Sequence, residues 1–169
     1  MLPVATILRR PRFGIGGFAF VAFIAALAFS ACTPEVNAEM RTYPGVNTIR
    51  AEHGLPALAP DGDLVQVARY RSKDMATRNY FSHVPPDGCN YVCVMDKMEV
   101  PHSFAGENIA WNTWDWTQTA DVAVQMWKNS PPHLENILNC HYERFGTGVA
   151  KGSDGKIYYA MIFEGNRDC

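Results

Sequence analysis

The sequence predicts an α+β fold, with helices filling the first two thirds of the chain and strands closing it. Apolar residues recur at helical spacing up to about residue 138, and several of these segments begin at a capping side chain or a proline. The end of the chain differs, because two apolar runs, 145–150 and 157–163, flank a Gly-Ser-Asp-Gly turn as in a β-hairpin. Such segregation of helices from strands is typical of α+β folds.

Two helices are predicted near the start of the domain. The first ordered segment covers 43–53, and Gly54 after it suits the end of a helix. A longer helix begins at Asp61 or Asp63, either of which can cap it. It reaches about residue 78 with its apolar residues on one face.

A proline-led segment, SPPHLENIL at 130–138, predicts another helix. Proline fixes φ near the helical value and lacks only an N–H that a first turn leaves unpaired. His133 therefore falls in a rigid first turn. The other elements expected in this part of the chain are helices over 92–98 and 120–128, the second capped by Thr117 or Thr119, and a strand over 104–111.

The N-terminus has the pattern of an export signal. Three arginines at positions 9, 10 and 12 precede an uncharged apolar run, 13–31. A membrane-spanning anchor is the alternative, because the run approaches the roughly 20 residues that a spanning helix needs. Small residues at the end of the run favour a signal peptide over 1–31, and the protein is expected to be exported to the periplasm, the cell envelope or the exterior.

The sequence offers two possible sites at which the signal peptide could be cleaved. Ser30-Ala31-Cys32 resembles a bacterial lipoprotein signal, in which Cys32 is lipidated and becomes the first residue. Cleavage after Ala38 is the alternative, and it would extend the signal to residue 38. The polar stretch 32–42 lacks periodicity and is expected to be a short tether, which leaves 43–169 as the domain.

The four cysteines that follow Cys32 predict two disulfides, because an even set is typical of exported proteins. Three pairings are possible, and sequence does not choose among them. We favour Cys89 with Cys93 and Cys140 with Cys169. A structural zinc site at CNYVC is the alternative, although no second cysteine pair follows at finger distance.

Charge and motifs exclude several function classes. Beyond residue 38 the chain has 12 Lys/Arg and 16 Asp/Glu, a net charge of −4, and no basic run, so nucleic acid is not an expected partner. The sequence has no G-x-S-x-G, no H-E-x-x-H, no P-loop and no dinucleotide fingerprint. The usual hydrolase and nucleotide-binding motifs are therefore missing.

Six segments stand in order along about 120 residues: IRAEHGLPAL (49–58), YFSHVPPDG (80–88), AGENIAW (105–111), VQMWKNSPPHLENIL (124–138), FGTGVA (145–150) and YYAMIF (158–163). Together they resemble the CAP superfamily (cysteine-rich secretory proteins, antigen 5 and plant pathogenesis-related proteins), and within it the bacterial SCP-like extracellular proteins. GEN or SPxH alone would be a weak signal, whereas the ordered combination is specific.

The resemblance implies an α-β-α sandwich, with a small antiparallel sheet between helical layers, and a cleft that binds a divalent metal, often zinc, in some members. Carried over by position, the cleft residues are His83, Glu107 and His133. The two histidines would ligate the metal, and Glu107 would orient an imidazole or act as a base. The family's second glutamate is replaced here by Ser130, and Pro132 stands where bacterial members commonly have glycine.

Each of these residues also has a structural interpretation, as a side chain that hydrogen-bonds backbone or packs in the core. Trp111, Trp114 and Trp116 are expected to pack in the core rather than to stack on a ligand.

The leading functional hypothesis is a secreted or surface binding module without robust catalysis, for a lipid, a cell-wall fragment or a protein, and with membrane contact only through its signal or lipid anchor. A metal-assisted hydrolase or peptidase that uses His83, His133 and Glu107 is the alternative. A structural surface protein is a third class.

Overall fold

The computed structural model describes residues 33–166 and 168–169. Contacts group the chain from Cys32 to Cys169 into one compact unit. The expected signal peptide and the lipidation candidate Cys32 lie outside the described residues. Among the described helices, none combines the length and the apolar character that crossing a membrane requires.

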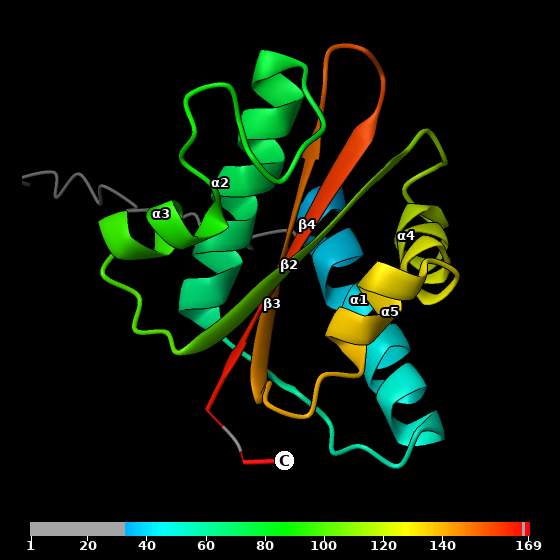
Figure 1. Ribbon diagram of the computed structural model, residues 1–169. Helices are drawn as coiled ribbons and strands as arrows, with labels where there is room; N and C mark the ends of the chain where they lie inside the picture. The colour runs from blue at the N-terminus through cyan, green and yellow to red at the C-terminus, as the bar shows by residue number, and fades with distance from the viewer. Residues whose placement is uncertain (1–32, 167) are drawn as a thin grey trace, which may run out of the picture. The chain divides into compact units, whose positions relative to one another are not determined.

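Four strands form one sheet in the order β1-β3-β4-β2, in which β1 pairs with β3 in parallel and the other pairs are antiparallel (Figure 1). The expected hairpin is β3 and β4, and the expected 104–111 strand is β2. The elements in chain order are α1 (Pro34–Glu52), β1 (Ala59–Pro60), α2 (Gly62–Arg78), α3 (Tyr91–Lys97), β2 (Phe104–Asn112), α4 (Thr119–Lys128), α5 (Pro131–Ile137), β3 (Arg144–Lys151) and β4 (Ile157–Gly165).

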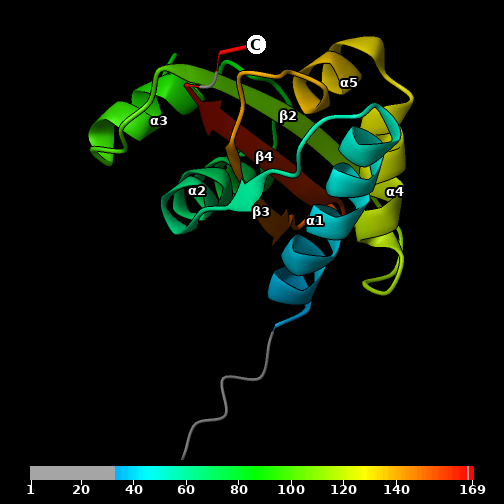
Figure 2. The same ribbon diagram turned by 90° about the horizontal axis from the view of Figure 1, so that it is seen from below.

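The sheet lies between two helical layers (Figures 1 and 2). Helices α1, α4 and α5 cover one face, where Trp127 and Phe145 are fully buried. Helices α2 and α3 cover the other, around Leu64 and Met75. Strand β4 is buried along its whole length, and its alternate residues serve the two cores. The predicted α+β class and the α-β-α sandwich are confirmed.

The expected tether over 32–42 is wrong, because helix α1 begins at Pro34. The Thr33 side chain caps it by accepting from the backbone N–H of Val36. Its early turns bury polar side chains: Glu39 binds Arg69 through both carboxylate oxygens, and Thr42 hydrogen-bonds Thr147. Because the buried face of these turns includes polar residues, the apolar periodicity that predicts a helix is missing. This half of α1 was therefore not predicted from the sequence.

The predicted boundaries of α2 and α5 are confirmed. Asp61 caps α2 by accepting from the N–H groups of Asp63 and Leu64. The predicted threonine cap of α4 is wrong, since no side-chain cap hydrogen bond is formed there. Thr119 is instead fully buried and donates to Asn112 at 2.6 Å.

Both disulfides have the favoured pairing. Cys89–Cys93 closes the loop in front of α3, with Cα atoms 5.2 Å apart. Cys140–Cys169 ties the C-terminus to the chain after α5, with Cα atoms 5.6 Å apart. The two loops that follow α2 and α5 are thereby restrained.

Candidate functional site

Strand β2 is an edge strand of the sheet, and the side chains of its GEN segment (106–108) face both helical layers. Successive side chains of a strand face opposite sides, so Glu107 faces the α2 layer and Asn108 faces the α5 layer. Both side chains are buried, with the residues 4% and 0% exposed. The edge of β2 therefore joins the two layers that carry the candidate histidines.

Side chains from both layers satisfy the open edge of β2. Its alternate carbonyl oxygens accept hydrogen bonds at 3.1–3.2 Å from three donors. These pairs are Tyr91 Oη to Ala105 O, Asn136 Nδ2 to Glu107 O, and Trp127 Nε1 to Ile109 O. This arrangement covers an edge that would otherwise be open to strand pairing.

His83 stands beside this edge with one ring nitrogen committed. Its Nδ1 lies 2.8 Å from Glu107 Oε2, and half of its side-chain surface is exposed. A carboxylate accepts, so Nδ1 carries the proton and Nε2 is left as the electron-pair donor. Orienting an imidazole through a carboxylate in this way is typical of metal-binding histidines.

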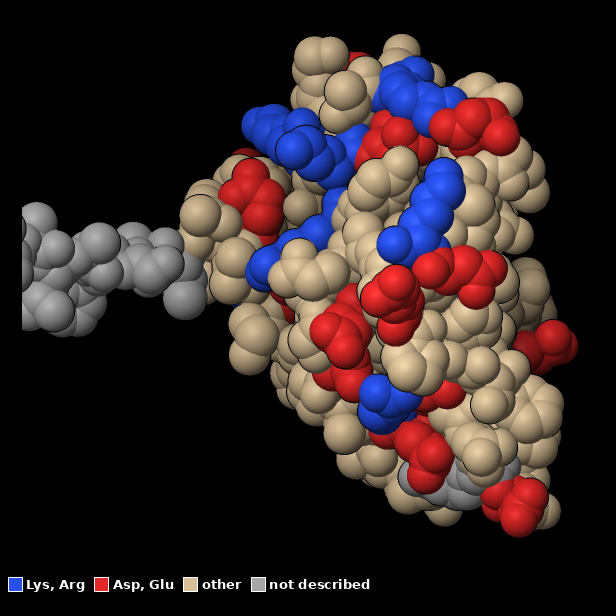
Figure 3. Space-filling view, turned by 90° about the vertical axis from the view of Figure 1, so that its left-hand side faces the viewer, with Lys and Arg blue, Asp and Glu red and all other residues tan. Residues whose placement is uncertain are grey.

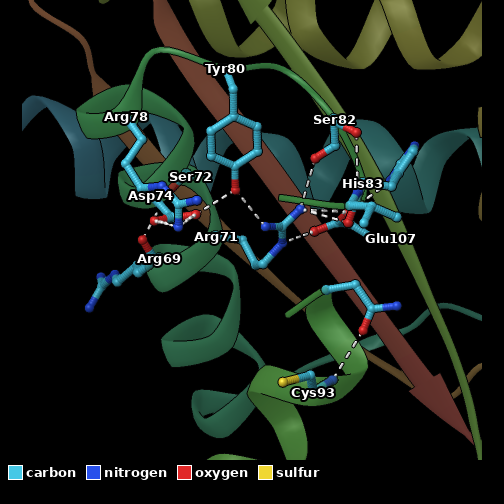
Figure 4. Close-up of polar contacts among 12 residues, drawn as sticks. Arg69, Arg71, Ser72, Asp74, Arg78, Tyr80, Ser82, His83, Cys93 and Glu107 are labelled. Carbon is cyan, nitrogen blue, oxygen red and sulfur yellow. Dashed lines mark hydrogen bonds and ion pairs between the residues drawn. The ribbon is translucent and has the colours of Figure 1, made fainter. Parts of the chain in front are cut away.

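Arg71 of α2, a residue that the sequence interpretation missed, is the centre of this arrangement (Figure 4). Its side chain is fully buried, and its Nε donates to Glu107 Oε1 at 2.8 Å. Its Nη2 donates to the carbonyl oxygens of Ser82 and His83 at 3.0 and 3.1 Å. Arg71 therefore holds both the carboxylate that orients His83 and the backbone on which His83 sits.

The hydrogen-bond network continues from Arg71 along α2. Arg71 Nη1 donates to Tyr80 Oη at 2.8 Å, and Tyr80 Oη donates to Asp74 Oδ2 at 2.5 Å. Burial and the Asp74 hydrogen bond raise the pKa of Tyr80 to about 12, so the phenol stays protonated. Arg78 joins Asp74 to Asp87 at the far side of the loop. The loop that carries His83 is thus fastened to α2 at several points.

His133 is held from the other layer. It lies half-buried in the first turn of α5, and its carbonyl accepts from Asn108 Nδ2 at 2.9 Å. Asn136, one turn later, donates to Asn108 Oδ1 at 2.9 Å. Buried Arg50 of α1 donates to the carbonyl oxygens of Ile137 and Asn139 where α5 ends. Both ends of the short helix are therefore held, whereas the two prolines had predicted only a rigid start.

The electrostatics favour a neutral imidazole at His133. Burial lowers the pKa of His133 below its ordinary value, and electrostatic repulsion from His83 lowers it further. The contacts place both histidines beside β2, because His83 Nδ1 contacts Glu107 and the His133 carbonyl oxygen accepts from the neighbouring Asn108. Neutral imidazole is the form that binds metal ions.

We expect the NMR titration of the His133 ring to have its midpoint below about 6.5, the ordinary histidine value. His83→Ala should raise the pKa of His133, while burial keeps it below that value. As the pH falls, His133 is protonated at a higher pH in the unfolded chain than in the folded protein. The stability that neutral His133 contributes is therefore present above about pH 6.5 and is lost as the pH falls. An unchanged midpoint in His83→Ala would show that the rings do not interact.

Two imidazoles, one of them oriented by a carboxylate, are donor types that a divalent ion takes in proteins. His83 Nε2 and neutral His133 would be the ligands, and other positions would remain for water. Glu107 does not fit as a ligand, since its oxygens already accept from Arg71 and His83. Among the described residues, the group of three candidate ligands whose atoms lie within 4.8 Å of one another is Cys140, His141 and Cys169, and not His83, Glu107 and His133. The sulfurs of Cys140 and Cys169 are bonded to each other, so they are not thiolate ligands.

The other three histidines have local contacts. His53 and His102 contact nearby backbone carbonyls, and His141 stacks on Phe104 with ring centroids 4.4 Å apart. The expectation of core packing is wrong for Trp111 and Trp114, which are 37% and 53% exposed. Trp116 is partly buried against the α1 core. A tryptophan-rich segment has no periodicity that would separate buried from exposed rings.

Comparisons with known proteins give one answer. The model of CAP, the cysteine-rich secretory protein family, matches residues 45–163. The chain is 38% identical over 120 residues to the "Uncharacterized membrane protein YlbC" of Bacillus subtilis (strain 168), covering 69% of this chain and 31% of that protein. The chain thus spans about a third of the length of this relative.

Solved structures agree with the family match. An extracellular protein containing an SCP domain from Bacillus anthracis has a TM-score of 0.69 at 32% identity, covering 78% of this chain and 41% of that one. A crystal structure of NaASP2 with Zn²⁺ shares the fold, with a TM-score of 0.55 at 13% identity over 75% of this chain and 78% of that one. The chain therefore belongs to CAP, the cysteine-rich secretory protein family.

Proposed function

We propose that this CAP-domain protein is a binding module of the cell envelope or the exterior, whose site is the His83–His133 pair at the β2 edge. The pair takes a divalent cation such as zinc, which would present open coordination positions to a ligand. The coarser part of this assignment, a CAP domain like those of bacterial extracellular proteins, follows from the family match and the solved structures.

The state of Glu107 carries the choice of binding over hydrolysis. A general base needs an oxygen free to take a proton from water. The Glu107 side chain is fully buried, is paired with Arg71 and accepts from His83. The position of the family's second glutamate is occupied by Ser130, so no second carboxylate is present there to act as the base in place of Glu107. The site therefore has groups that orient and ligate, and it lacks a group poised to activate water.

Calorimetric titration with zinc near pH 7.5 tests the site. His83→Ala and His133→Ala should each abolish most of the binding, because each removes one of two ligands. Glu107→Gln should weaken binding about 10–100-fold, since the amide orients the imidazole less well. Ser130→Glu should strengthen it if the new carboxylate points inward.

His102→Ala is the matched control, because this histidine contacts the backbone of Val100 outside the site. Wild-type protein that binds zinc no better than the His83→Ala/His133→Ala double variant would refute the metal site. Turnover of a peptide library by zinc-loaded wild type, lost in Glu107→Gln, would instead establish the hydrolase.

The start of α1 bears on how the protein is attached. Cleavage after Ala38 would remove the Thr33 cap and the helix from Pro34 to Ala38. It would also place a charged α-amino group at Glu39, which is buried and paired with Arg69. Both effects disfavour that cleavage in the folded domain. We therefore favour attachment at Cys32, and the relative YlbC is itself described as a membrane protein.

Mass mapping of the mature N-terminus checks this attachment in material from the native host. We expect the first residue to be Cys32 with acyl chains, of which two or more give stable anchoring. A mature chain that begins at Glu39 would rule the lipid anchor out. In that case α1 would lack its Thr33 cap, and the backbone amides of its remaining first turns should exchange rapidly with solvent.

A further inference from the structure

Two hollows flank the first turns of α1. One, of about 490 Å³, is lined by Pro34, Asn37, Met40, Arg41, Trp116 and Thr117. The other, of about 450 Å³, lies along a different face of the same turns, where Lys73 and Lys151 are among its lining residues. Neither belongs to the histidine site, and each has its own chemistry.

The first hollow exposes large apolar side chains. Met40 is 59% exposed, and Trp114, in the same loop as the lining residue Trp116, is also largely exposed. Grouped apolar side chains at a surface indicate an interaction site. Tryptophan in particular favours the boundary between lipid tails and water, because its ring is apolar and its N–H is polar.

The second hollow is lined by charged side chains, with Arg69, Lys73 and Lys151 as its basic residues and Glu35 and Glu39 as its acidic ones. Lys73 and Lys151 are exposed, and neither forms an ion pair with a carboxylate of the described residues. Arg69 beside them is already bound to Glu39. The chain from residue 33 onward is acidic, with 12 Lys/Arg against 17 Asp/Glu. Most basic side chains of the face shown in Figure 3 lie in its upper half, where acidic side chains lie beside them.

The chain itself indicates what the two hollows meet. Thr33, the cap of α1, follows directly after Cys32 and the uncharged run 13–31. Two extended residues span at most about 7 Å. If the chain is held in a membrane at Cys32, as proposed above, the start of α1 is kept within roughly that distance of the lipid headgroups. The side chains that surround this start are then within reach of lipid.

We propose that this end of the domain is a membrane-contact face that binds an anionic phospholipid bilayer. Met40, Trp114 and Trp116 enter the boundary between headgroups and acyl chains, while Lys73 and Lys151 pair with lipid phosphates. The inference rests on the proposed membrane attachment. It adds a direct contact between the folded domain and lipid, which fixes how the domain is oriented on the membrane.

The experiment uses the full chain reconstituted into vesicles of phosphatidylglycerol and phosphatidylcholine, in which the acyl chains are brominated and quench tryptophan fluorescence. Flotation reports attachment, and quenching reports contact of the face with lipid. We expect attached protein to be quenched more strongly in these vesicles than in phosphatidylcholine alone. Replacing Trp114 and Trp116 by phenylalanine should remove most of the quenching.

The double variant Lys73→Glu/Lys151→Glu should lower the affinity of the face for the anionic bilayer about fivefold or more. Each lysine near an anionic surface contributes a factor of about five in binding. Met40→Glu should act in the same direction. The matched controls are Lys128→Glu and Met126→Glu. Lys128 pairs with Glu52 at the other end of α1, about 27 Å from its start. Neither control should change the quenching.

The outcomes separate the two proposals. A chain that floats with the vesicles but is not quenched, or is quenched equally in the lysine variants and their controls, overturns the contact face and leaves attachment standing. A chain that does not float overturns both. Neither outcome affects zinc binding at His83 and His133.

Discussion

Arg71→Ala should lower the free energy of unfolding by about 3–5 kcal/mol. The change leaves the buried carboxylate of Glu107 without its ion-pair partner, and it leaves the carbonyl oxygens of Ser82 and His83 without a donor. Breaking a buried ion pair by removing one partner costs more than the pair itself contributes, because the remaining charge stays out of water. Urea unfolding monitored by fluorescence measures the loss.

Arg78→Ala is the control for this prediction. Arg78 lies on the same helix and also bridges two carboxylates, but its side chain is a third exposed. Its loss should cost at most about 1 kcal/mol, as for other surface ion pairs. Folded Arg71→Ala protein should in addition bind zinc less tightly, since Glu107 and the His83 backbone lose their common support. Equal stability of the two variants would contradict the central role assigned to Arg71.

Gly148→Ala should destabilise the domain by about 3 kcal/mol or more, at the upper end of the usual cost of overpacking. A Cβ atom at Gly148 would overlap the backbone of Ala68 and Arg69, and one at Gly146 would overlap Leu64 and Val65. Helix α2 thus lies directly against these two glycines of β3. A side chain there must push the whole helix away, and α2 carries Arg71 toward β2.

Gly62→Ala provides the matched control, because it makes the same chemical change on α2 itself. Apart from adjacent residues and the backbone of its own helix, no heavy atom lies within 4 Å of the added Cβ at that first helical position. Its stability should stay within about 0.5 kcal/mol of wild type, as for surface substitutions in general. Urea unfolding again gives the values. If Gly148→Ala is as stable as Gly62→Ala, the backbone contact between α2 and β3 is not tight.

Local patterns account for the parts of the fold that sequence predicted well. The cap at Asp61, the prolines before His133 and the glycine-containing turn between β3 and β4 each act within a few residues. These signals do not depend on distant partners. Elements bounded by them could therefore be placed from sequence with nearly correct ends.

The missed features depend on partners far along the chain. The first turns of α1 bury Glu39 because Arg69 lies opposite it, thirty positions later. Two-residue β1 was missed because it exists only by pairing with Arg144 and Phe145 of β3. The sequence held one usable sign of Arg71. It falls on the apolar face of α2 at helical spacing from Val67 and Met75, where an arginine needs a buried partner.

The sequence by itself determined the fold class, the disulfide-forming cysteines and the identity of His83, Glu107 and His133 as candidates, because ordered motifs and residue types carry that information. Only the tertiary structure decided which groups contact them. In the fold, the Glu107 carboxylate pairs with Arg71 and accepts a hydrogen bond from His83. The fold also places two histidines from opposite helical layers at one edge of β2. The reason is physical: whether a carboxylate orients an imidazole or activates water depends on which groups already occupy its oxygens, and those groups come from other elements.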